Sequence, residues 1–269
     1  MELVTTHVHT TFCNHADGSV EEMAAAAERA GVSTMAFTEH YPLTHAFDPT
    51  ERISMRPERV ADYLAAVEEA RRAHPGLEIL SGCELDWLGA ADDRGLAADD
   101  FADFEIVLGS VHYIDGWGID DKSRQEVWAE AGVDWLWRRY FELWCEAVSS
   151  DWPFTVMSHP DLIKKYGHRP SFDPAPLYRE AAEAAAAAGR MVELNTSGAY
   201  YACEEAFPGP DFLRELCRAG VPCTVGTDAH TPAHVARDIP QAYRLLKEAG
   251  YRCVTVPCRD GSRREMALD

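Results

Sequence analysis

Short apolar runs of strand length alternate with helical patterns from one end of the chain to the other. The runs that we predict as strands of one sheet cover residues 2–6, 33–38, 77–83, 104–110, 154–158, 190–195 and 222–226. Repeated strand–helix alternation favours a parallel sheet with helices on its outside. The chain has 269 residues, and a (β/α) barrel typically uses about 250 residues as a single unit. We therefore predict an α/β fold, a single domain over residues 1–269, closed into a barrel.

Helix-end signals support these boundaries. Ser19 is followed three positions later by Glu22, which is the spacing of a capping box, and Gly31 lies where that helix would end. The other predicted helices cover residues 57–73, 123–150, 174–188, 210–219 and 239–249, and a last short strand is expected near 252–256. The helix over 123–150 is rich in Trp, Tyr and Phe, and we interpret these rings as packing on the barrel exterior rather than as a surface that stacks on a ligand.

Charge, apolar runs and cysteine content limit the binding partners and the cellular compartment that we expect for the protein. The net charge is −20, which argues against general nucleic-acid binding because such a surface repels phosphate backbones. No run reaches the roughly 18 apolar residues of a membrane span, and the N-terminus lacks the features of a signal peptide, so we expect a cytoplasmic protein. The eight cysteines form no CxxC pair and indicate thiols in a reducing compartment. Cys13 and Cys83 lie close to the site described next, where a ligand role is open to either of them.

Seven of the eleven histidines, together with two carboxylates, follow the predicted strands where a barrel would place them on one rim. They are His7, His9, His15, His40, Glu84, His112, His159, Asp228 and His230. Catalytic groups of such barrels lie at the carboxyl ends of the strands. Imidazoles and carboxylates are ligands of Zn, Fe and Mn. The pattern therefore predicts a site for more than one divalent metal ion.

The spacing of two pairs supports this site. His7 and His9 project to the same side of an extended segment, because strand side chains alternate with a period of two. Asp228 and His230 repeat that spacing after the last predicted barrel strand. Either motif alone is weak, and the strength of the prediction lies in the recurrence of ligands after separate strands.

A cluster of this kind suits the hydrolysis of phosphate esters. A water that bridges two divalent ions loses its proton near neutral pH, and the ions neutralise charge on the phosphoryl and leaving oxygens. The sequence contains no GxSxG elbow and no P-loop that would indicate a different chemistry.

Further polar residues are candidates for the substrate side of the site. Asp17 and His230 are the candidate catalytic groups, although Asp17 could equally be a turn aspartate. A basic cluster after the His159 strand would bind the substrate phosphate or form a solvated charge run, and Asn195 would contact substrate or order a loop. If the cluster binds phosphate, replacing Lys164 by alanine should raise KM more than it lowers kcat. The candidate substrate-binding residues are Lys164, Lys165, His168, Arg169, Asn195 and Tyr200.

Several motifs resemble those of the PHP (polymerase and histidinol phosphatase) family of metal-dependent phosphoesterases, and most of all its histidinol-phosphate phosphatases. The resemblance extends over essentially the whole chain. Its motifs are HVHTTFCNHADG (7–18), TEH (38–40), GCE (82–84), GSVHYID (109–115), SHPDLIKKYG (158–167), ELNTSG (193–198) and GTDAH (226–230).

The resemblance implies a distorted seven-stranded (β/α) barrel, TIM-like, that holds two to three divalent metal ions (Zn, Fe or Mn). It implies one metal on His7, His9, Glu84 and Asp228. It further implies a second metal on a bridging Glu84 with His112 and His159, and a third on His15, His40 and His230. The implied activity is that of a metal-dependent phosphomonoesterase acting on L-histidinol phosphate in histidine biosynthesis.

One segment departs from the family pattern. After ELNTSG the histidinol phosphatases usually continue with a Leu-Arg-Lys-like segment, whereas this chain has Ala199-Tyr200-Tyr201. The departure leaves hydrolysis as the prediction but keeps open a PHP phosphoesterase for a nucleotide, a cyclic phosphodiester or another phosphomonoester. Two further alternatives are an amidohydrolase, which would usually show a metal-bridging lysine, and a non-hydrolytic structural metal-binding module. The expected partner is a small phosphorylated substrate rather than nucleic acid or a membrane, and the oligomeric state is left open.

Overall fold

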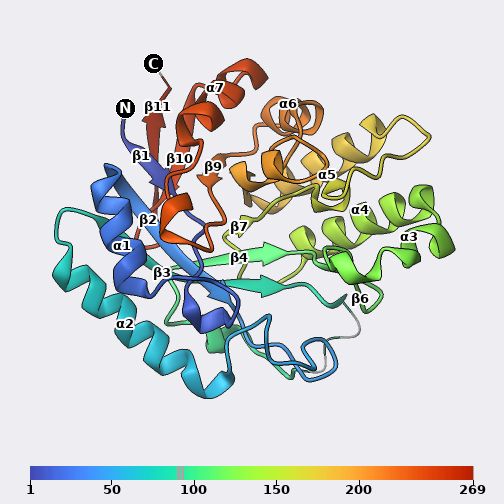
Figure 1. Cartoon of the computed structure of the whole chain (residues 1–269). Coiled ribbons are helices and arrows are strands. Elements are labelled where there is room, and N and C mark those ends of the chain that lie inside the picture. The colour runs from blue at the N-terminus through green and yellow to red at the C-terminus, as the bar shows by residue number, and fades with distance from the viewer. Residues whose placement is uncertain (90–91, 93, 269) are drawn as a thin grey trace.

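The computed structural model describes residues 1–89, 92 and 94–268, and its central element is a parallel sheet of seven strands (Figure 1). In sheet order the strands are β1 (Leu3–Thr5), β2 (Val32–His40), β3 (Glu78–Asp86), β4 (Ile106–Ser110), β7 (Val156–Met157), β8 (Met191–Asn195) and β9 (Cys223–Gly226). All neighbouring pairs are parallel. These are the seven strands that the apolar runs predict.

The two edge strands meet just beyond their carboxyl ends. The backbone N–H of Thr6 donates to the carbonyl of Val225, and the N–H of Asp228 donates to the carbonyl of His7, both at 2.9 Å. One more rung follows, a parallel bridge between Val8 and Ala229. These bonds nearly close the sheet, so the predicted distorted seven-stranded barrel is confirmed.

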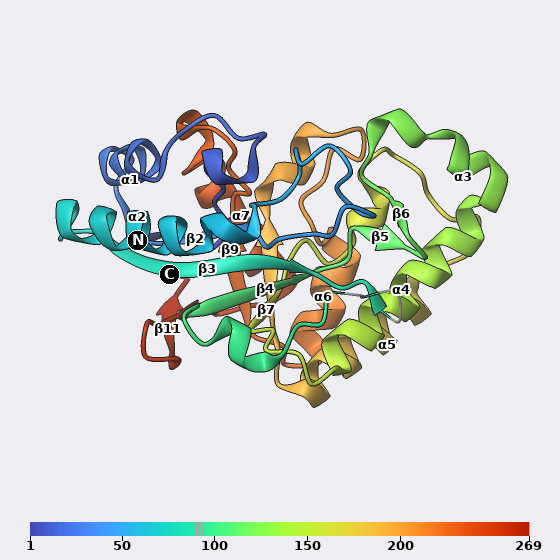
Figure 2. The same cartoon turned by 90° about the horizontal axis from the view of Figure 1, so that it is seen from below.

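Helices surround the strands in both views (Figures 1 and 2). They are α1 (Val20–Arg29), α2 (Val60–Ala73), α3 (Glu126–Ala131), α4 (Val133–Ser149), α5 (Ala175–Ala188), α6 (Pro210–Arg218) and α7 (Ile239–Ala249). The predicted capping box at Ser19 and Glu22 is present at the start of α1. The predicted helix over 123–150 is instead divided into α3 and α4 at Gly132, whose φ of 84° lies outside the helical range.

Four of the five aromatic side chains of α4 pack against the barrel exterior, and the fifth, Trp135, is exposed. Trp137, Tyr140, Phe141 and Trp144 are buried, and their rings contact one another, α5 and α6. The packing interpretation of this helix is therefore confirmed, and these rings supply core rather than a ligand surface.

A second, smaller group of apolar side chains fills the barrel interior. It consists of Ala36, Leu80, Ile106, Leu108, Val156 and Met191. Side chains two residues apart share a face of a strand, so Glu84 stands on the same face of β3 as Leu80. His40 stands in the same way above Ala36 on β2. On β2 and β3, the side chains that face the barrel interior are therefore apolar within the strand and polar at its carboxyl end.

Two short antiparallel pairs lie outside the barrel sheet. The strand expected near 252–256 is β10 (Cys253–Pro257), and it pairs with β11 (Arg263–Ala267). Beyond the rim, β5 (Tyr113–Ile114) and β6 (Trp117–Gly118) form a hairpin around Asp115-Gly116, a dipeptide that favours two-residue turns. In the part of the chain that the structure describes, no helix has the length and apolar character needed to cross a membrane.

Candidate metal centre

The structure brings all nine predicted ligands together at the carboxyl rim of the barrel. His7 and His9 follow β1, His40 ends β2, Glu84 lies near the end of β3, and the other ligands follow β1, β4, β7 and β9. Every one except His15, Asp228 and His230 is buried. Among the residues that the structure describes, four groups could hold a metal ion, and three of them consist entirely of these ligands.

The first group is formed by His7, His9, Glu84 and Asp228. The Nε2 atoms of His7 and His9 lie 2.9 Å apart, and Glu84 Oε2 is 3.3 and 3.4 Å from them. Asp228 Oδ1 completes the group at 3.3 Å from His9 Nε2 and 3.7 Å from His7 Nε2.

Glu84 connects this group to a second one. Its other oxygen, Oε1, lies 2.8 Å from His159 Nε2 and 3.6 Å from His112 Nε2. The two carboxylate oxygens thus face different sets of imidazoles, which is the arrangement required of a bridging ligand.

The third group contains His15, His40 and His230, whose candidate ligand atoms all lie within 4.8 Å of one another. His15 Nε2 and His230 Nε2 are 3.0 Å apart. In both rings Nδ1 faces a backbone carbonyl at 3.0 Å, that of Cys13 and that of Asp228 respectively. Because a carbonyl can only accept, Nδ1 carries the proton of each neutral ring and the two Nε2 lone pairs face each other. A cation between them removes this repulsion, so these residues fit a metal ion.

The charge states of two of these groups, Glu84 and His230, suit metal ligands. Burial alone would raise the pKa of Glu84, but the surrounding imidazoles of His40, His7 and His112 hold it well below its usual value. Burial and the neighbouring His9 lower the pKa of His230 to about 3. The site therefore presents an ionised carboxylate beside a neutral imidazole.

Three buried carboxylates behind the ligands were not singled out from the sequence. Glu193 Oε1 lies 2.9 Å from His7 Nδ1, Glu39 Oε1 lies 3.3 Å from His9 Nδ1, and Asp86 Oδ1 lies 2.7 Å from His112 Nδ1. Such partners set the tautomer and orientation of a metal-binding imidazole. The sequence could have indicated Glu39 and Asp86 by their place on strands that carry a ligand, and Glu193 by its place in the motif ELNTSG.

Gly226 makes room for one of these contacts. A Cβ at this position would lie 1.7 Å from Glu193 Oε1 and 2.7 Å from the Cβ of His7. Only glycine therefore allows β9 to pass this close to the Glu193–His7 pair.

Replacing Glu193 with glutamine should weaken the metal site without removing a ligand. The carboxylate faces His7 Nδ1 and accepts from the backbone N–H of His159 at 2.9 Å. An amide cannot serve both partners as an acceptor, so we expect zinc affinity to fall about 10- to 100-fold. A competitive chelator titration measures this loss, and an unchanged zinc affinity would show that Glu193 has no part in holding the site.

A hollow of about 460 Å³ opens in front of the ligands. Of the candidate substrate-binding residues, Lys165 and Tyr200 line it, as do Tyr201 and Arg237, which were not proposed as binding residues. Lys165 Nζ lies 3.3 Å from Asp120 and 4.5 Å from the centre of the Tyr201 ring. A second hollow of about 560 Å³ shares His15, His40 and His112 with the first and continues to the β5–β6 hairpin.

The prediction that Lys164 faces the substrate is wrong. Its side chain is fully buried, and Nζ lies 2.8 Å from Asp161 Oδ2 and 3.1 Å from Glu205 Oε2. It also donates to the carbonyl of Ala206 at 2.8 Å. Lys164 thus pairs with the buried carboxylate of Asp161 and the half-buried one of Glu205 behind the rim, and it neither binds phosphate nor belongs to a solvated charge run.

Replacing Lys164 with alanine is therefore expected to lower stability rather than to raise KM. Removing one partner of a buried ion pair leaves the charge of Asp161 uncompensated, which typically costs about 3–5 kcal/mol. Denaturant unfolding should show this loss, whereas KM of the folded fraction should stay at the wild-type value. A raised KM with unchanged stability would restore the phosphate-binding role.

Three other candidates also lie outside the hollow. The His168 ring stacks on Trp128 with centroids 4.1 Å apart, and Arg169 pairs with Glu205 at 3.1 Å. Asn195 is buried, and its Oδ1 accepts from the N–H of Ser197 at 2.9 Å. These contacts position loops, so the substrate-binding predictions for His168, Arg169 and Asn195 are corrected, and Asn195 takes the loop-ordering role.

The structure does not bring the carboxyl group of Asp17 to the site. Asp17 is exposed and lines neither hollow, while its backbone N–H donates to the carbonyl of His230 at 2.7 Å. This bond ties the loop after β1 to the loop after β9, and it supports the turn interpretation over that of a proton donor.

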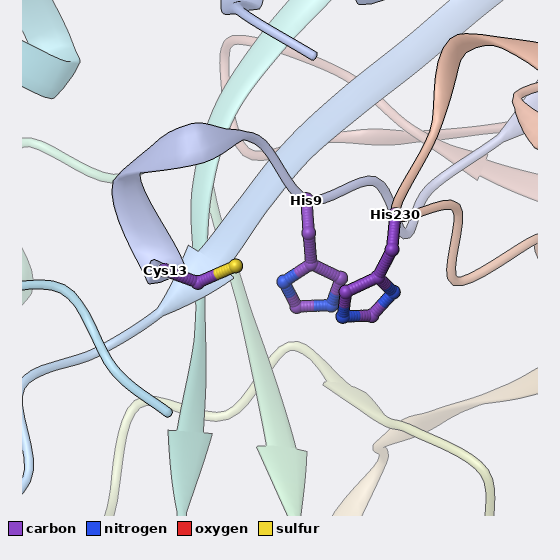
Figure 3. A group of neighbouring side chains, drawn as sticks. All are labelled: His9, Cys13 and His230. Atoms are coloured by element: carbon purple, nitrogen blue, oxygen red, sulfur yellow. The ribbon is translucent and has the colours of Figure 1, made fainter. Parts of the chain in front are cut away.

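Cys13 places a thiol, which is another possible metal ligand, near the imidazoles and carboxylates of the cluster. It forms a group with His9 and His230, and Figure 3 shows its sulfur approaching the His9 ring on the side away from His230. The thiol donates to the carbonyl of Thr10 at 3.2 Å, and burial raises its pKa above the usual value. The imidazoles and carboxylates therefore remain the better ligand set.

The chain is similar in sequence to histidinol phosphatases of other organisms. The chain is 32% identical over 255 residues to a probable histidinol-phosphatase of Deinococcus radiodurans, covering 94% of this chain and 96% of that protein. It is 24% identical to the histidinol-phosphatase of Bacillus subtilis, covering 90% of this chain and 97% of that protein.

A solved structure shares the fold. It is the histidinol phosphate phosphatase of Lactococcus lactis in complex with zinc, L-histidinol and phosphate, with a TM-score of 0.78 and 22% identity over 96% of this chain and 97% of that one. The family description "PHP domain" matches residues 5–197, which is more than half of the sequence. The chain therefore belongs to the PHP domain family.

Proposed function

We propose that this protein is a metal-dependent phosphomonoesterase that hydrolyses L-histidinol phosphate to L-histidinol and phosphate. The observation that carries the proposal is the division of the Glu84 carboxylate between two sets of imidazoles at the rim. The similarity to histidinol phosphatases over nearly the whole chain supports the choice of substrate. The enzyme would act in the cytoplasm, in the synthesis of histidine.

The nine rim ligands bind divalent metals, and we propose up to three ions, with zinc as the first choice because of the zinc-containing relative. Bound metals would supply a nucleophilic oxygen from water and neutralise charge on the phosphoryl group. His7, His9, Glu84 and Asp228 would hold the first ion, His112 and His159 would share Glu84 for the second, and His15, His40 and His230 would hold the third. His230 also stays the candidate catalytic group.

The two hollows beside the metal ligands would position the substrate. The hollow in front of the ligands would receive the phosphate, with the Lys165 ammonium on its wall. The adjoining hollow, lined by Phe47, Ile53 and Tyr113, would receive the organic part of the ester.

The alternatives differ in what they require of the site. A different phosphomonoester would be hydrolysed by the same metals, and its organic part would fill the adjoining hollow in a different way. An amidohydrolase would require a bridging lysine, whereas Glu84 stands between the two groups in this chain. A purely structural module would bind metal without phosphate release.

Growth of a bacterial strain that lacks its own histidinol phosphatase tests the proposal in a cell. The gene for this chain should restore growth without histidine, and a Glu84→Ala version made in equal amount should not. Failure of the wild-type gene, with soluble metal-loaded protein present, would reject histidinol phosphate as the substrate.

A further inference from the structure

The hollow that contains the metal ligands has one cationic side chain without an anionic partner. Arg237 lines the hollow beside His230 and Asp228. Within residues 1–89, 92 and 94–268, its guanidinium makes no hydrogen bond or ion pair, and its Nε is buried without a partner. Lys165, in contrast, is already paired with Asp120.

Exposed arginines such as Arg29 and Arg72 are also unpaired in the described part of the chain, but Arg237 differs from them because its unpaired guanidinium has a buried N–H group. The chain has 45 acidic and 25 basic residues, so partners for a surface arginine are plentiful. The nearest carboxylate in the sequence, Asp238, instead accepts from the hydroxyl of Tyr200 at 2.6 Å. Leaving a buried donor unsatisfied is costly, so this N–H group is expected to gain its partner when the hollow is filled.

The position of Arg237 is set by its neighbours before any ligand arrives. Its guanidinium carbon lies 3.9 Å from the centre of the Tyr200 ring. Its backbone carbonyl accepts from the hydroxyl of Thr196 at 2.9 Å. A guanidinium held on an aromatic face loses little freedom on binding an anion.

The remaining charges of the hollow indicate which ligand it accepts. Its carboxylates are Glu84 and Asp228, which face the imidazoles, and Asp120, which faces Lys165. Among the described residues that line the hollow, Arg237 is thus the one with a charged side chain that no other residue neutralises. A phosphate group offers several acceptor oxygens, and guanidinium binds two of them at once.

We propose that Arg237 is a phosphate-binding residue of this site, held in place by Tyr200 and Asp238 and supplying the guanidinium that the segment Ala199-Tyr200-Tyr201 lacks. Tyr200 is then a positioning residue rather than a direct contact of the substrate. The inference rests on the proposed function, because it takes the phosphate of the ester as the anion.

The test is direct binding of inorganic phosphate to the zinc-loaded protein, measured by calorimetry, since binding requires no turnover. Arg237→Gln should weaken phosphate binding about tenfold to a hundredfold, the size expected for a lost charge-assisted hydrogen-bond pair. Arg237→Lys should weaken phosphate binding about three- to tenfold, because the lysine ammonium keeps the positive charge but not the two parallel N–H donors of a guanidinium. Binding of L-histidinol, which has no phosphate, should change less than about twofold.

Arg218→Gln is the matched control, since Arg218 is an exposed arginine of α6 paired with Glu215. Unchanged phosphate affinity in Arg237→Gln would overturn the inference. An equal loss for phosphate and L-histidinol, or a loss of zinc, would also overturn it, because Arg237 would then be structural. If wild-type protein binds phosphate through Arg237 but releases none from L-histidinol phosphate, the proposed substrate fails while the phosphate-binding role stands.

Discussion

Replacing Glu84 with alanine should lower kcat/KM for L-histidinol phosphate by about a thousandfold or more. The carboxylate lies within 3.6 Å of nitrogen atoms of His7, His9, His40, His112 and His159, so its loss removes a ligand from two groups at once. Metal chemistry of this kind contributes several kcal/mol of transition-state stabilisation, and each 1.36 kcal/mol is tenfold in rate. Steady-state kinetics with measured zinc content tests this expectation.

His74→Ala provides the control. His74 lies at the end of α2, where it contacts Glu28 at 2.9 Å and Glu21 at 3.1 Å on α1, and it lines neither hollow of the site. Its replacement should leave kcat/KM within about twofold of wild type. A Glu84→Ala protein as active as the His74 variant would reject Glu84 as the bridging ligand.

Removing the metal ions should abolish activity and lower stability together. Without cations, the facing nitrogens of His15 and His230 at 3.0 Å repel one another. A ligand present at about 1,000 times its Kd stabilises a protein by roughly 4 kcal/mol. For a chain of this size that corresponds to a Tm about 10 °C higher.

Chelation followed by addition of Zn, Fe or Mn measures both effects in one sample. Phosphate release should disappear with the chelator and return with a divalent metal, and the Tm should follow it. Phosphate release that persists in metal-free protein would contradict the metal-dependent chemistry, whereas a restored Tm without any phosphate release would favour a structural module.

The ligands could be predicted from the sequence because two regular rules place them. Parallel strands of a barrel deliver their carboxyl ends to one rim, and the period of two keeps His7 beside His9. Both rules depend on local pattern alone. The same reasoning located the seven strands, whose apolar runs are continuous because both faces are buried.

The remaining features depend on contacts between distant parts of the chain. Lys164 and Lys165 are adjacent in sequence, yet one is buried against Asp161 and the other lines the hollow. Arg237 stands seven residues after His230 in an irregular loop, and only the fold shows that it faces the ligands. β11 escaped prediction because its sequence, RREMA, is mostly charged and exposed.

The most direct test of the account is the ratio of kcat/KM for L-histidinol phosphate to that for a generic aryl phosphate, measured with the zinc-loaded protein. We expect a ratio of at least about a hundred, because the two hollows together offer contacts to both the phosphate and the organic part, worth roughly 3 kcal/mol at 1.36 kcal/mol per tenfold. A ratio near one, or no release from L-histidinol phosphate by protein with a full metal content, would contradict the proposed function.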